Sequence, residues 1–348
     1  MQAQPVTIPI RSLSIGFSTL EWWVFVQQRL DHAIDVADLT RTFRGPDGKR
    51  KLAVDGLSFH VRRGEMVGLL GPNGAGKTST VKVLMTVLLP TSGKVTVMGH
   101  DVVAEAQRVR RLTGVILGGD TGLYGRLSAR DNLLLFADLY GLPYRSQKRR
   151  IAELLDLVGL LGVERKRVET FSRGMKQRLH IARGLLHDPE VVIMDEPSNG
   201  IDPVGARELR QIIREQVRAE RTVLLTTHYM FEAEELCDRV VVMANSRKIA
   251  EGTPQSLKEA TAGQVVLTLD VQGADQRHVE RLRTLAGVSS VNLTNRDDGQ
   301  NIDLYSSPDG DVTVAALAVL GDVSVLRVSK REPTLEDAYV ALVAGGTR

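Results

Sequence analysis

Cysteine and long apolar runs are scarce in this sequence. Cys237 is the only cysteine among 348 residues, so no disulfide can form within the chain, and a reducing, cytosolic setting is expected. No stretch of about 18 apolar residues occurs, so we expect no membrane-spanning helix. The nearest run, residues 20–26, is short, contains Glu21 and lacks a cleavage site of the signal-peptide kind. Any role at a membrane is therefore expected to come through a partner or a surface contact.

A large excess of charge is also missing. The chain has 45 Lys and Arg against 42 Asp and Glu, and a net charge of +3 is too small to indicate a nucleic-acid partner. Basic clusters at residues 44–51, 145–150 and 165–167 are interpreted as solvated surface, with contact to an anionic membrane leaflet as the alternative. The length suffices for two domains of ordinary size.

The chain divides into three parts, of which the first two precede residue 259. Residues 1–33 are predicted to be an N-terminal extension, with an amphipathic helix near residues 19–30 that holds Trp22 and Trp23 and either packs on its own domain or meets a partner or membrane interface. Residues 34–258 alternate apolar strands with helical patterns, which is typical of an α/β domain with a largely parallel core sheet. The expected strands are 52–61, 66–70, 94–98, 114–117, 190–194, 222–227 and 239–243, and the expected helices are 78–89, 129–140, 147–155, 174–186 and 204–219.

A different pattern begins after the stretch 252–263. Residues 264–348 give the order β-α-β-β-α-β, which predicts a ferredoxin-like α+β accessory domain. A last helix over residues 334–343 is expected after a proline, with Thr334 as its N-cap and Asp337 in its first turn. We interpret this domain either as a stabilising appendage or as a part that regulates or extends a dimer.

A glycine-rich segment after the apolar strand 66–70 fits the pattern G-x-x-x-x-G-K-[ST]. Its glycines let the backbone wrap closely around phosphate groups, and the N-terminal end of the following helix adds positive potential. The lysine supplies a mobile cation, and the hydroxyl after it can bind Mg²⁺. We therefore predict an ATP site made by Gly71, Pro72, Asn73, Gly74, Ala75, Gly76, Lys77, Thr78 and Ser79, with Thr78 as a ligand of Mg²⁺.

Two acids, Asp195 and Glu196, close the apolar run 191–194. Ligands of α/β sheets bind at the carboxyl ends of the strands. Asp195 is predicted to hold Mg²⁺ through water, and Glu196, which points in a different direction, to polarise the attacking water. A solvated strand end is the usual meaning of such a pair, but its position downstream of a phosphate loop favours the functional interpretation.

The segment 171–179, Phe-Ser-Arg-Gly-Met-Lys-Gln-Arg-Leu, resembles the signature motif of ABC-transporter ATPases. It stands just before the acidic strand, as that family requires. Residues 198–202 are similar to the family's D-loop, His228 is similar to its switch histidine, and Phe43 is placed like the aromatic residue that stacks on adenine. These motifs occur in the family's order, and the resemblance covers residues 34–258.

The resemblance implies an ABC-type P-loop ATPase domain with a RecA-like core, an antiparallel β subdomain and an α-helical subdomain. It implies that Ser172 and Gly174, at the start of a helix, face the γ-phosphate bound by an opposite subunit, so that two copies of the chain, or this chain and a relative, sandwich two nucleotides. Glu196, His228 and Lys77 are the catalytic residues that it implies. ATP and Mg²⁺ are the expected nucleotide and metal.

Two positions depart from the family pattern. Arg173 replaces the first glycine of the signature, where a bulky cation either crowds the loop or contacts phosphate. Activity is expected to survive this change. Gly119 stands where the family usually has a glutamine that ligates Mg²⁺, so either Asp120 or water substitutes, or the contact is absent.

Residues 122–133 and 332–339 resemble subunits of ABC-2-type, daunorubicin-resistance-like exporters. This resemblance implies a homodimer at the cytoplasmic face of the cell membrane, held there by a separate transmembrane permease that docks near residues 119–145. The expected cargo is a drug, antibiotic, lipid or other hydrophobic substrate. Two alternatives stay open: a soluble ABC ATPase that acts on a macromolecule, and a nucleotide-binding partner without catalysis, against which Glu196 and His228 argue.

Overall fold

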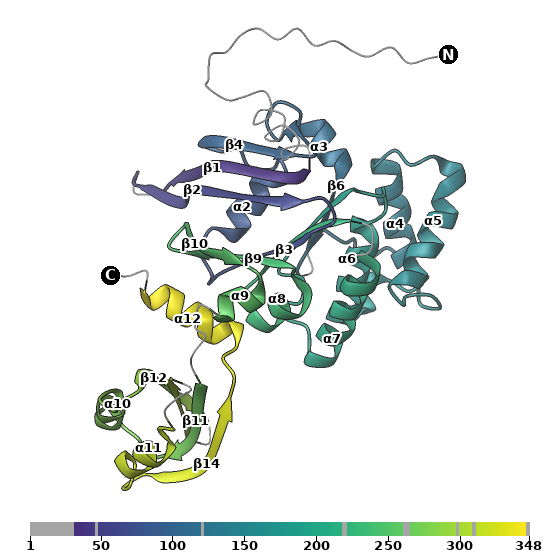
Figure 1. The fold of residues 1–348 in the computed structure, drawn as a ribbon. Helices are drawn as coiled ribbons and strands as arrows, with labels where there is room; N and C mark the ends of the chain where they lie inside the picture. The colour runs from purple at the N-terminus through teal and green to yellow at the C-terminus, as the bar shows by residue number, and fades with distance from the viewer. Residues whose placement is uncertain are drawn as a thin grey trace, which may run out of the picture.

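The computed structural model describes residues 31–45, 48–119, 122–217, 221–259, 265–296, 299–307 and 311–345 (Figure 1). The helix predicted near Trp22 and Trp23 lies outside these residues, as does Asp120. None of the described helices is both long enough and apolar enough to cross a membrane.

A six-stranded sheet forms the centre of the first domain. Its strands are parallel except β10, which joins the neighbouring strand β9 in antiparallel fashion, so the largely parallel sheet predicted from the sequence is present. The strands β7 and β8 are buried along almost their whole length, as expected of a sheet that is covered on both faces. In spatial order the strands are β10 (Arg247–Gly252), β9 (Arg239–Ala244), β3 (Met66–Leu70), β8 (Thr222–Thr227), β7 (Val191–Asp195) and β6 (Thr113–Leu117).

A second, antiparallel sheet lies beside it and encloses a separate apolar core against α2. The sequence patterns missed its strand β1, because register shifts interrupt the pairing of β1 with β2 and so break the alternation of buried and exposed residues. In spatial order the strands are β2 (Arg50–Arg62), β1 (His32–Arg44), β4 (Ser92–Val97) and β5 (His100–Asp101).

The helices of this domain include a packed group of α4, α5 and α6, in which α6 also packs on β6, whereas α4 and α5 lie farther from the central sheet (Figure 1). Two predicted helices differ from the structure. The helix expected to reach residue 89 ends at Leu84, where Thr86 adopts a φ of +61°, and the helix expected to reach residue 219 changes into a π turn after Ile212. The helices are α2 (Lys77–Leu84), α3 (Ala106–Leu112), α4 (Ala129–Leu139), α5 (Tyr144–Leu157), α6 (Arg173–Gly184), α7 (Pro203–Ile212), α8 (Met230–Leu236) and α9 (Pro254–Glu259), with the π turn at Ile213–Val217 and a 3₁₀ turn at Val168–Thr170.

The C-terminal domain has its own antiparallel sheet and its own apolar core. The six elements appear in the predicted order, and the spatial order of the strands is β12-β13-β11-β14. They are β11 (Val265–Gln272), α10 (Gln276–Arg283), β12 (Val288–Arg296), β13 (Gly299–Ser306), α11 (Thr313–Val319) and β14 (Ser324–Arg331).

The last helix, α12 (Leu335–Gly345), leaves the C-terminal sheet and packs on the first domain against α8, α9 and β10 (Figure 1). Its N-terminus is capped as predicted, because Thr334 N donates to Asp337 Oδ2 at 2.7 Å and Asp337 N donates to Thr334 Oγ1 at 3.4 Å. Leu335, Tyr339 and Leu342 join the apolar core of the first domain. This helix therefore connects the two domains, which the sequence patterns did not predict.

Candidate functional site

The phosphate-loop motif occupies the connection between β3 and α2, as predicted. Two of its glycines are required because another part of the backbone lies too close for a side chain. A Cβ on Gly71 would lie 2.4 Å from the carbonyl oxygen of Met243, and one on Gly76 would lie 2.4 Å from that of Ala53. Gly76 also has a φ of +107°, a conformation that favours glycine. The loop thus forms a backbone-lined cradle that side chains would fill.

Lys77 lies over this cradle. Its side chain is only 4% exposed, and its Nζ donates to the carbonyl oxygens of Gly71 at 2.7 Å and Pro72 at 3.2 Å. The same Nζ lies 3.5 Å from Glu196 Oε1. A buried ammonium group with backbone carbonyls and one carboxylate as neighbours is well placed to meet an anionic ligand.

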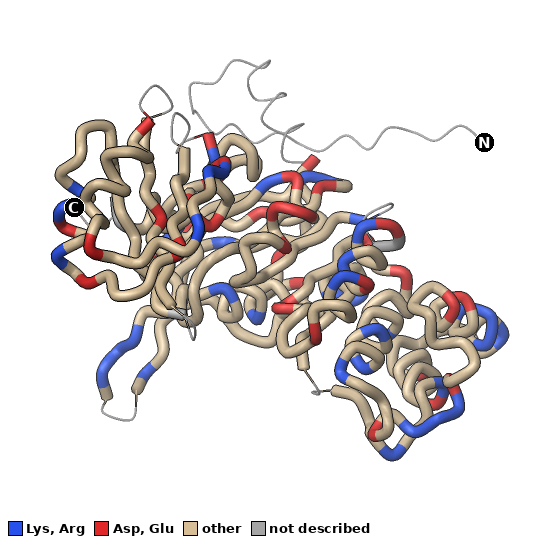
Figure 2. The backbone as a smooth tube through the Cα atoms, turned by 90° about the horizontal axis from the view of Figure 1, so that it is seen from below, with Lys and Arg blue, Asp and Glu red and all other residues tan. Residues whose placement is uncertain are grey.

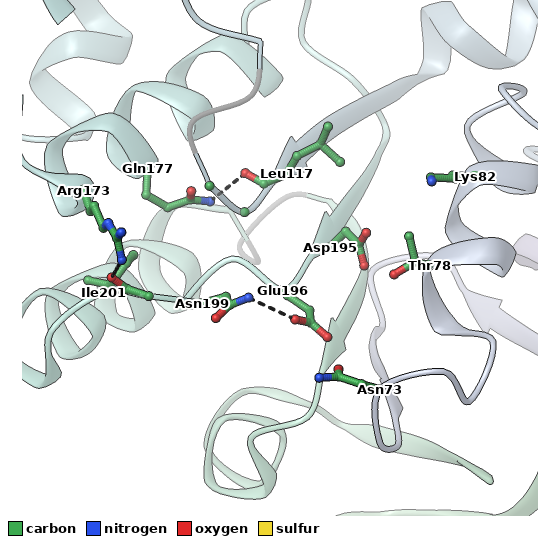
Figure 3. Close-up of a pocket in the computed structure, with 13 residues that line it drawn as sticks. Asn73, Thr78, Lys82, Leu117, Arg173, Gln177, Asp195, Glu196, Asn199 and Ile201 are labelled. Atoms are coloured by element: carbon green, nitrogen blue, oxygen red, sulfur yellow. Dashed lines mark hydrogen bonds between the residues drawn. The ribbon is translucent and has the colours of Figure 1, made fainter. Parts of the chain in front are cut away.

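The acidic strand end faces the loop. Asp195 closes β7, and its Oδ1 accepts a hydrogen bond of 2.5 Å from Thr226 Oγ1 of the neighbouring strand β8. Figure 3 shows its carboxylate turned toward the hydroxyl of Thr78 across a cavity of about 730 Å³. One carboxylate and one hydroxyl on facing elements are the kind of oxygen ligands that Mg²⁺ prefers, together with phosphate oxygens and water.

Glu196 lies at the centre of the site. Its Oε1 is 3.3 Å from His228 Nδ1 and 3.5 Å from Lys77 Nζ, and its Oε2 accepts from Asn199 Nδ2 at 3.4 Å. His228 follows β8 directly, and its ring lies tilted at 38° to that of Tyr229, with 4.0 Å between the ring centroids. The structure therefore brings together the three side chains that the family resemblance names as catalytic.

Phe43 lies on the rim of a second cavity of about 330 Å³, next to Gly74, Gly76 and Ser79 of the phosphate loop. Its ring is 38% exposed, and the Arg41 guanidinium lies over it at 4.6 Å from the centroid. The two cavities share Asn73, Thr78 and Glu196 among their lining residues. A ligand with a planar ring beside Phe43 and phosphates at the loop fits this arrangement.

Ser172 caps the N-terminus of α6, where its Oγ accepts a hydrogen bond from Met175 N at 3.2 Å. Gly174, in the first turn, is partly exposed. Arg173 lines the larger cavity, and its Nη1 donates to the carbonyl oxygen of Gly200 at 3.3 Å (Figure 3). In this subunit the arginine therefore lies along the loop after Glu196 and does not crowd the start of α6.

The loop after β6 is held by one face of α6. Gln177 Nε2 lies 3.2 Å from Leu117 O, His180 Nε2 lies 3.1 Å from Gly119 O, and Arg183 Nη1 donates to Gly122 O at 2.5 Å. Burial lowers the pKa of the Arg183 guanidinium. The described part of this loop is thus fixed through its backbone, and Gly119 offers only its carbonyl group.

Several residues of the site received no role from the sequence, namely Thr226, Asn199, Gln177 and Lys82, although Gln177 and Asn199 lie within the signature and D-loop segments. Thr226 had a usable signal, because a hydroxyl at the end of a strand beside an acidic strand end can reach that acid. The other three depend on how loops and helices fold back, which periodicity does not encode. Among the described residues no group of three or more His, Cys, Asp or Glu side chains could by itself hold a metal ion.

A phosphate loop, an acidic strand end and a histidine at the carboxyl edge of a parallel sheet define a P-loop nucleotide hydrolase. Residues 54–199 match the family model described as ABC transporter. The linearmycin resistance ATP-binding protein LnrL of Bacillus subtilis is 34% identical over 84% of this chain and 94% of its own length. The daunorubicin resistance ATP-binding protein DrrA3 of Streptomyces coeruleorubidus is 39% identical over 90% of this chain and 98% of its own length. The chain belongs to the ATP-binding proteins of ABC transporters and is an ABC-type ATPase.

A solved structure described as the ATP-binding subunit of an ABC transporter superposes with a TM-score of 0.58 at 32% identity. The match covers 66% of this chain and 92% of that one. The predicted ABC-type α/β fold is therefore confirmed, and the C-terminal sheet is an addition to it.

Proposed function

We propose that this chain is the ATPase subunit of an ABC-2-type exporter of a hydrophobic compound such as a drug, antibiotic or lipid. The observation that carries the proposal is the convergence of Lys77 and His228 on Glu196, at 3.5 and 3.3 Å. The similarity to a linearmycin and a daunorubicin resistance protein over most of the chain supports the assignment to export.

The proposed roles follow from position. Glu196 polarises the attacking water, His228 contacts that water and the γ-phosphate, and Lys77 binds the phosphates. Phe43 stacks on adenine, and Ser172 and Gly174 reach the γ-phosphate bound by a second copy of the chain. The phosphates lie along Gly71, Pro72, Asn73, Gly74, Ala75, Gly76, Lys77, Thr78 and Ser79.

Thr78 and Asp195 are the residues that would hold Mg²⁺. The donor set fits, because Mg²⁺ in such sites takes one or two protein oxygens together with phosphate oxygens and water. When bound, the ion would neutralise charge that develops on the phosphates. Thr226 keeps the Asp195 carboxylate oriented through its hydrogen bond of 2.5 Å.

We propose residues 34–258 as the ATPase domain and residues 264–348 as a ferredoxin-like domain. The second assignment is supported by the spatial strand order β14-β11-β13-β12, in which two β-α-β units interleave in an antiparallel sheet. Helix α12 belongs to residues 264–348 in sequence, although it packs on the ATPase domain.

The permease is proposed to dock on the described part of residues 119–145. Four large side chains are exposed there, Tyr124 at 53%, Leu139 at 67%, Tyr140 at 42% and Tyr144 at 86%, and the last three lie at the end of α4 and the start of α5. The basic residues 145–150 and 165–167 belong to the same helical region, where Figure 2 shows Lys and Arg along the backbone. Such charge favours a peripheral contact with an anionic leaflet beside the permease.

Replacement of the proposed base tests the catalytic assignment. Glu196→Gln is expected to lower ATP turnover by about 100-fold or more, because the amide cannot polarise water. The matched control is Glu190→Gln, which changes an exposed acid just before the same strand and should leave turnover unchanged. Turnover near that of the unmodified chain in Glu196→Gln would refute the assignment.

The transport assignment has its own test. A tagged chain expressed in its native cell is expected to be isolated together with a membrane protein of several spans. Isolation with ribosomes or DNA, and without such a protein, would instead favour an ABC ATPase that acts on a macromolecule.

A further inference from the structure

Glu232 is a buried acid outside the predicted site. It lies in α8, four residues after His228, and only 2% of its surface is exposed. Its Oε1 accepts a hydrogen bond from the hydroxyl of Ser198, which is itself 6% exposed. Its Oε2 is buried as well. A buried acid in such a position needs a structural or functional reason.

The contacts of Glu232 link the turn that follows Glu196 to the segment that follows His228. Ser198 stands two residues after Glu196, in a turn fixed by a hydrogen bond from Asn199 N to Glu196 O at 3.1 Å. On the other side, Glu232 N donates to Tyr229 O at 3.1 Å, which ties the acid to the residue after His228. The same two segments also meet through their side chains, because His228 Nδ1 lies 3.3 Å from Glu196 Oε1.

Glu232 differs from the other acids of α8 in its ion pairs. Glu235, one turn along the same helix, pairs with Arg210 at 2.6 Å and Arg214 at 2.5 Å. No ion pair of Glu232 occurs among the residues that the structure describes. Burial raises the pKa of its carboxyl group, against the opposing effects of the Ser198 hydroxyl and of the charges on Arg210 and His228.

We propose that Glu232 is a positioning residue for ATP hydrolysis, which through Ser198 fixes the turn after Glu196 relative to His228. The inference rests on the proposed roles of Glu196 and His228. This role requires no contact of Glu232 with the nucleotide or with the attacking water. It acts by joining two loops, each of which carries one of the reacting side chains, and small displacements of such groups have large effects on rate.

A double-mutant cycle tests the link. Glu232→Leu and Ser198→Ala each remove the same hydrogen bond, and each is expected to lower kcat for ATP by about 10- to 100-fold with little change in KM. The double variant should lose no more than the worse single variant, because the bond can be lost only once. Glu232→Gln keeps a side-chain oxygen that can accept from Ser198, and it should retain most of the kcat. The control Glu235→Leu, which removes an acid of the same helix, should leave kcat within about twofold.

Hydrogen exchange gives a second measurement that needs no hydrolysis. Glu232→Leu and Ser198→Ala should raise amide exchange in residues 196–202 and 228–232, and Glu232→Gln should not. If Glu232→Leu does not fold, Ser198→Ala decides the question alone. Additive losses of kcat, a Glu232→Gln variant as impaired as Glu232→Leu, or unchanged exchange in residues 196–202 would overturn the proposal. An unmodified chain without ATPase activity would refute the assigned catalytic roles, while the exchange data would still show whether Glu232 holds the two loops together.

Discussion

The backbone of Glu196 has a φ of +50°, in the left-handed region that residues with side chains rarely occupy. Such a conformation persists only where the surroundings fix it, and it gathers at functional sites. Here Glu196 N donates to Thr226 O at 3.0 Å, and Asn199 N donates to Glu196 O at 3.1 Å. The strain places the carboxylate off the line of β7, which lets Asp195 and Glu196 serve different partners although they are adjacent.

The two glycines after β6 are predicted to differ in their tolerance of substitution. A Cβ on Gly118 would lie 2.3 Å from the carbonyl oxygen of Glu196, so Gly118→Ala must displace that residue, and kcat should fall by about 100-fold. A Cβ on Gly119 would meet no atom within 4 Å, although its φ of +89° is unfavourable for a side chain. Gly119→Gln should therefore cost about 1 kcal/mol of stability and remain active.

Steady-state ATPase rates and thermal unfolding of these two variants check the prediction. Each serves as the control for the other, since both change a glycine of the same loop. A folded but inactive Gly119→Gln variant would contradict the open space around position 119. An active Gly118→Ala variant would show that the close contact between Gly118 and the backbone of Glu196 is not needed for hydrolysis.

At the scale of elements, α6 and α12 show where sequence reasoning succeeds and where it ends. The start of α6 was predictable from the signature motif, since Ser172 is a strong N-cap. The contacts of Gln177, His180 and Arg183 with the loop after β6 were not, because they join segments about 60 residues apart. The capping of α12 was likewise local and predictable. Its packing on α8 was not, because it joins the end of the chain to the first domain.

The hydrogen bonds and the ion pair of Asp337, at the start of α12, give a prediction for the stability of the fold. Asp337 is 6% exposed, accepts from Tyr305 Oη at 2.5 Å and pairs with Arg331 at 2.5 Å, and these hydrogen bonds outweigh burial and lower its pKa from 3.8 to about 2. Because the folded-state pKa is lowered, the stabilisation is complete above about pH 4 and is lost as the pH falls toward 2. Asp337→Asn is expected to reduce the free energy of unfolding by about 2 kcal/mol at pH 7.

Urea unfolding of Asp337→Asn and the unmodified chain, at several values of pH, measures this effect. The difference between the two should shrink between about pH 4 and pH 2. Glu336→Gln is the matched control, because Glu336 is the exposed neighbour of Asp337 and should change stability by less than about 0.5 kcal/mol. A difference that does not depend on pH would contradict the role given to the ion pair.

At the scale of the whole molecule, the proposed site is incomplete in one chain. Ser172 and Gly174 stand at the N-terminus of α6 and line neither cavity at the phosphate loop of the same chain, so the signature is proposed to serve the nucleotide of a second copy. With hydrolysis blocked by Glu196→Gln, ATP should therefore convert monomers into dimers. Addition of Lys77→Ala should prevent this, because it weakens nucleotide binding through the loss of a buried cation.

Size-exclusion chromatography with light scattering checks this outcome with and without ATP and Mg²⁺. The unmodified chain provides the comparison, since hydrolysis should leave its dimer short-lived. A Glu196→Gln chain that stays monomeric in ATP while binding the nucleotide would contradict a shared site. A dimer that also forms with Lys77→Ala would show association without nucleotide.

The sequence by itself determined the chemistry of this protein, because the phosphate loop, the acidic strand end and the signature are local patterns whose residues act through their own backbone and side chains. It also determined the order of elements in the C-terminal domain, since apolar periodicity reports burial one segment at a time, but in the first domain it missed β1, β5 and β10. The tertiary structure alone decided which distant segments meet: Glu232 with Ser198, α6 with the loop after β6, and α12 with α8. Those contacts depend on the packing of whole elements against one another, and no spacing within a single segment encodes them.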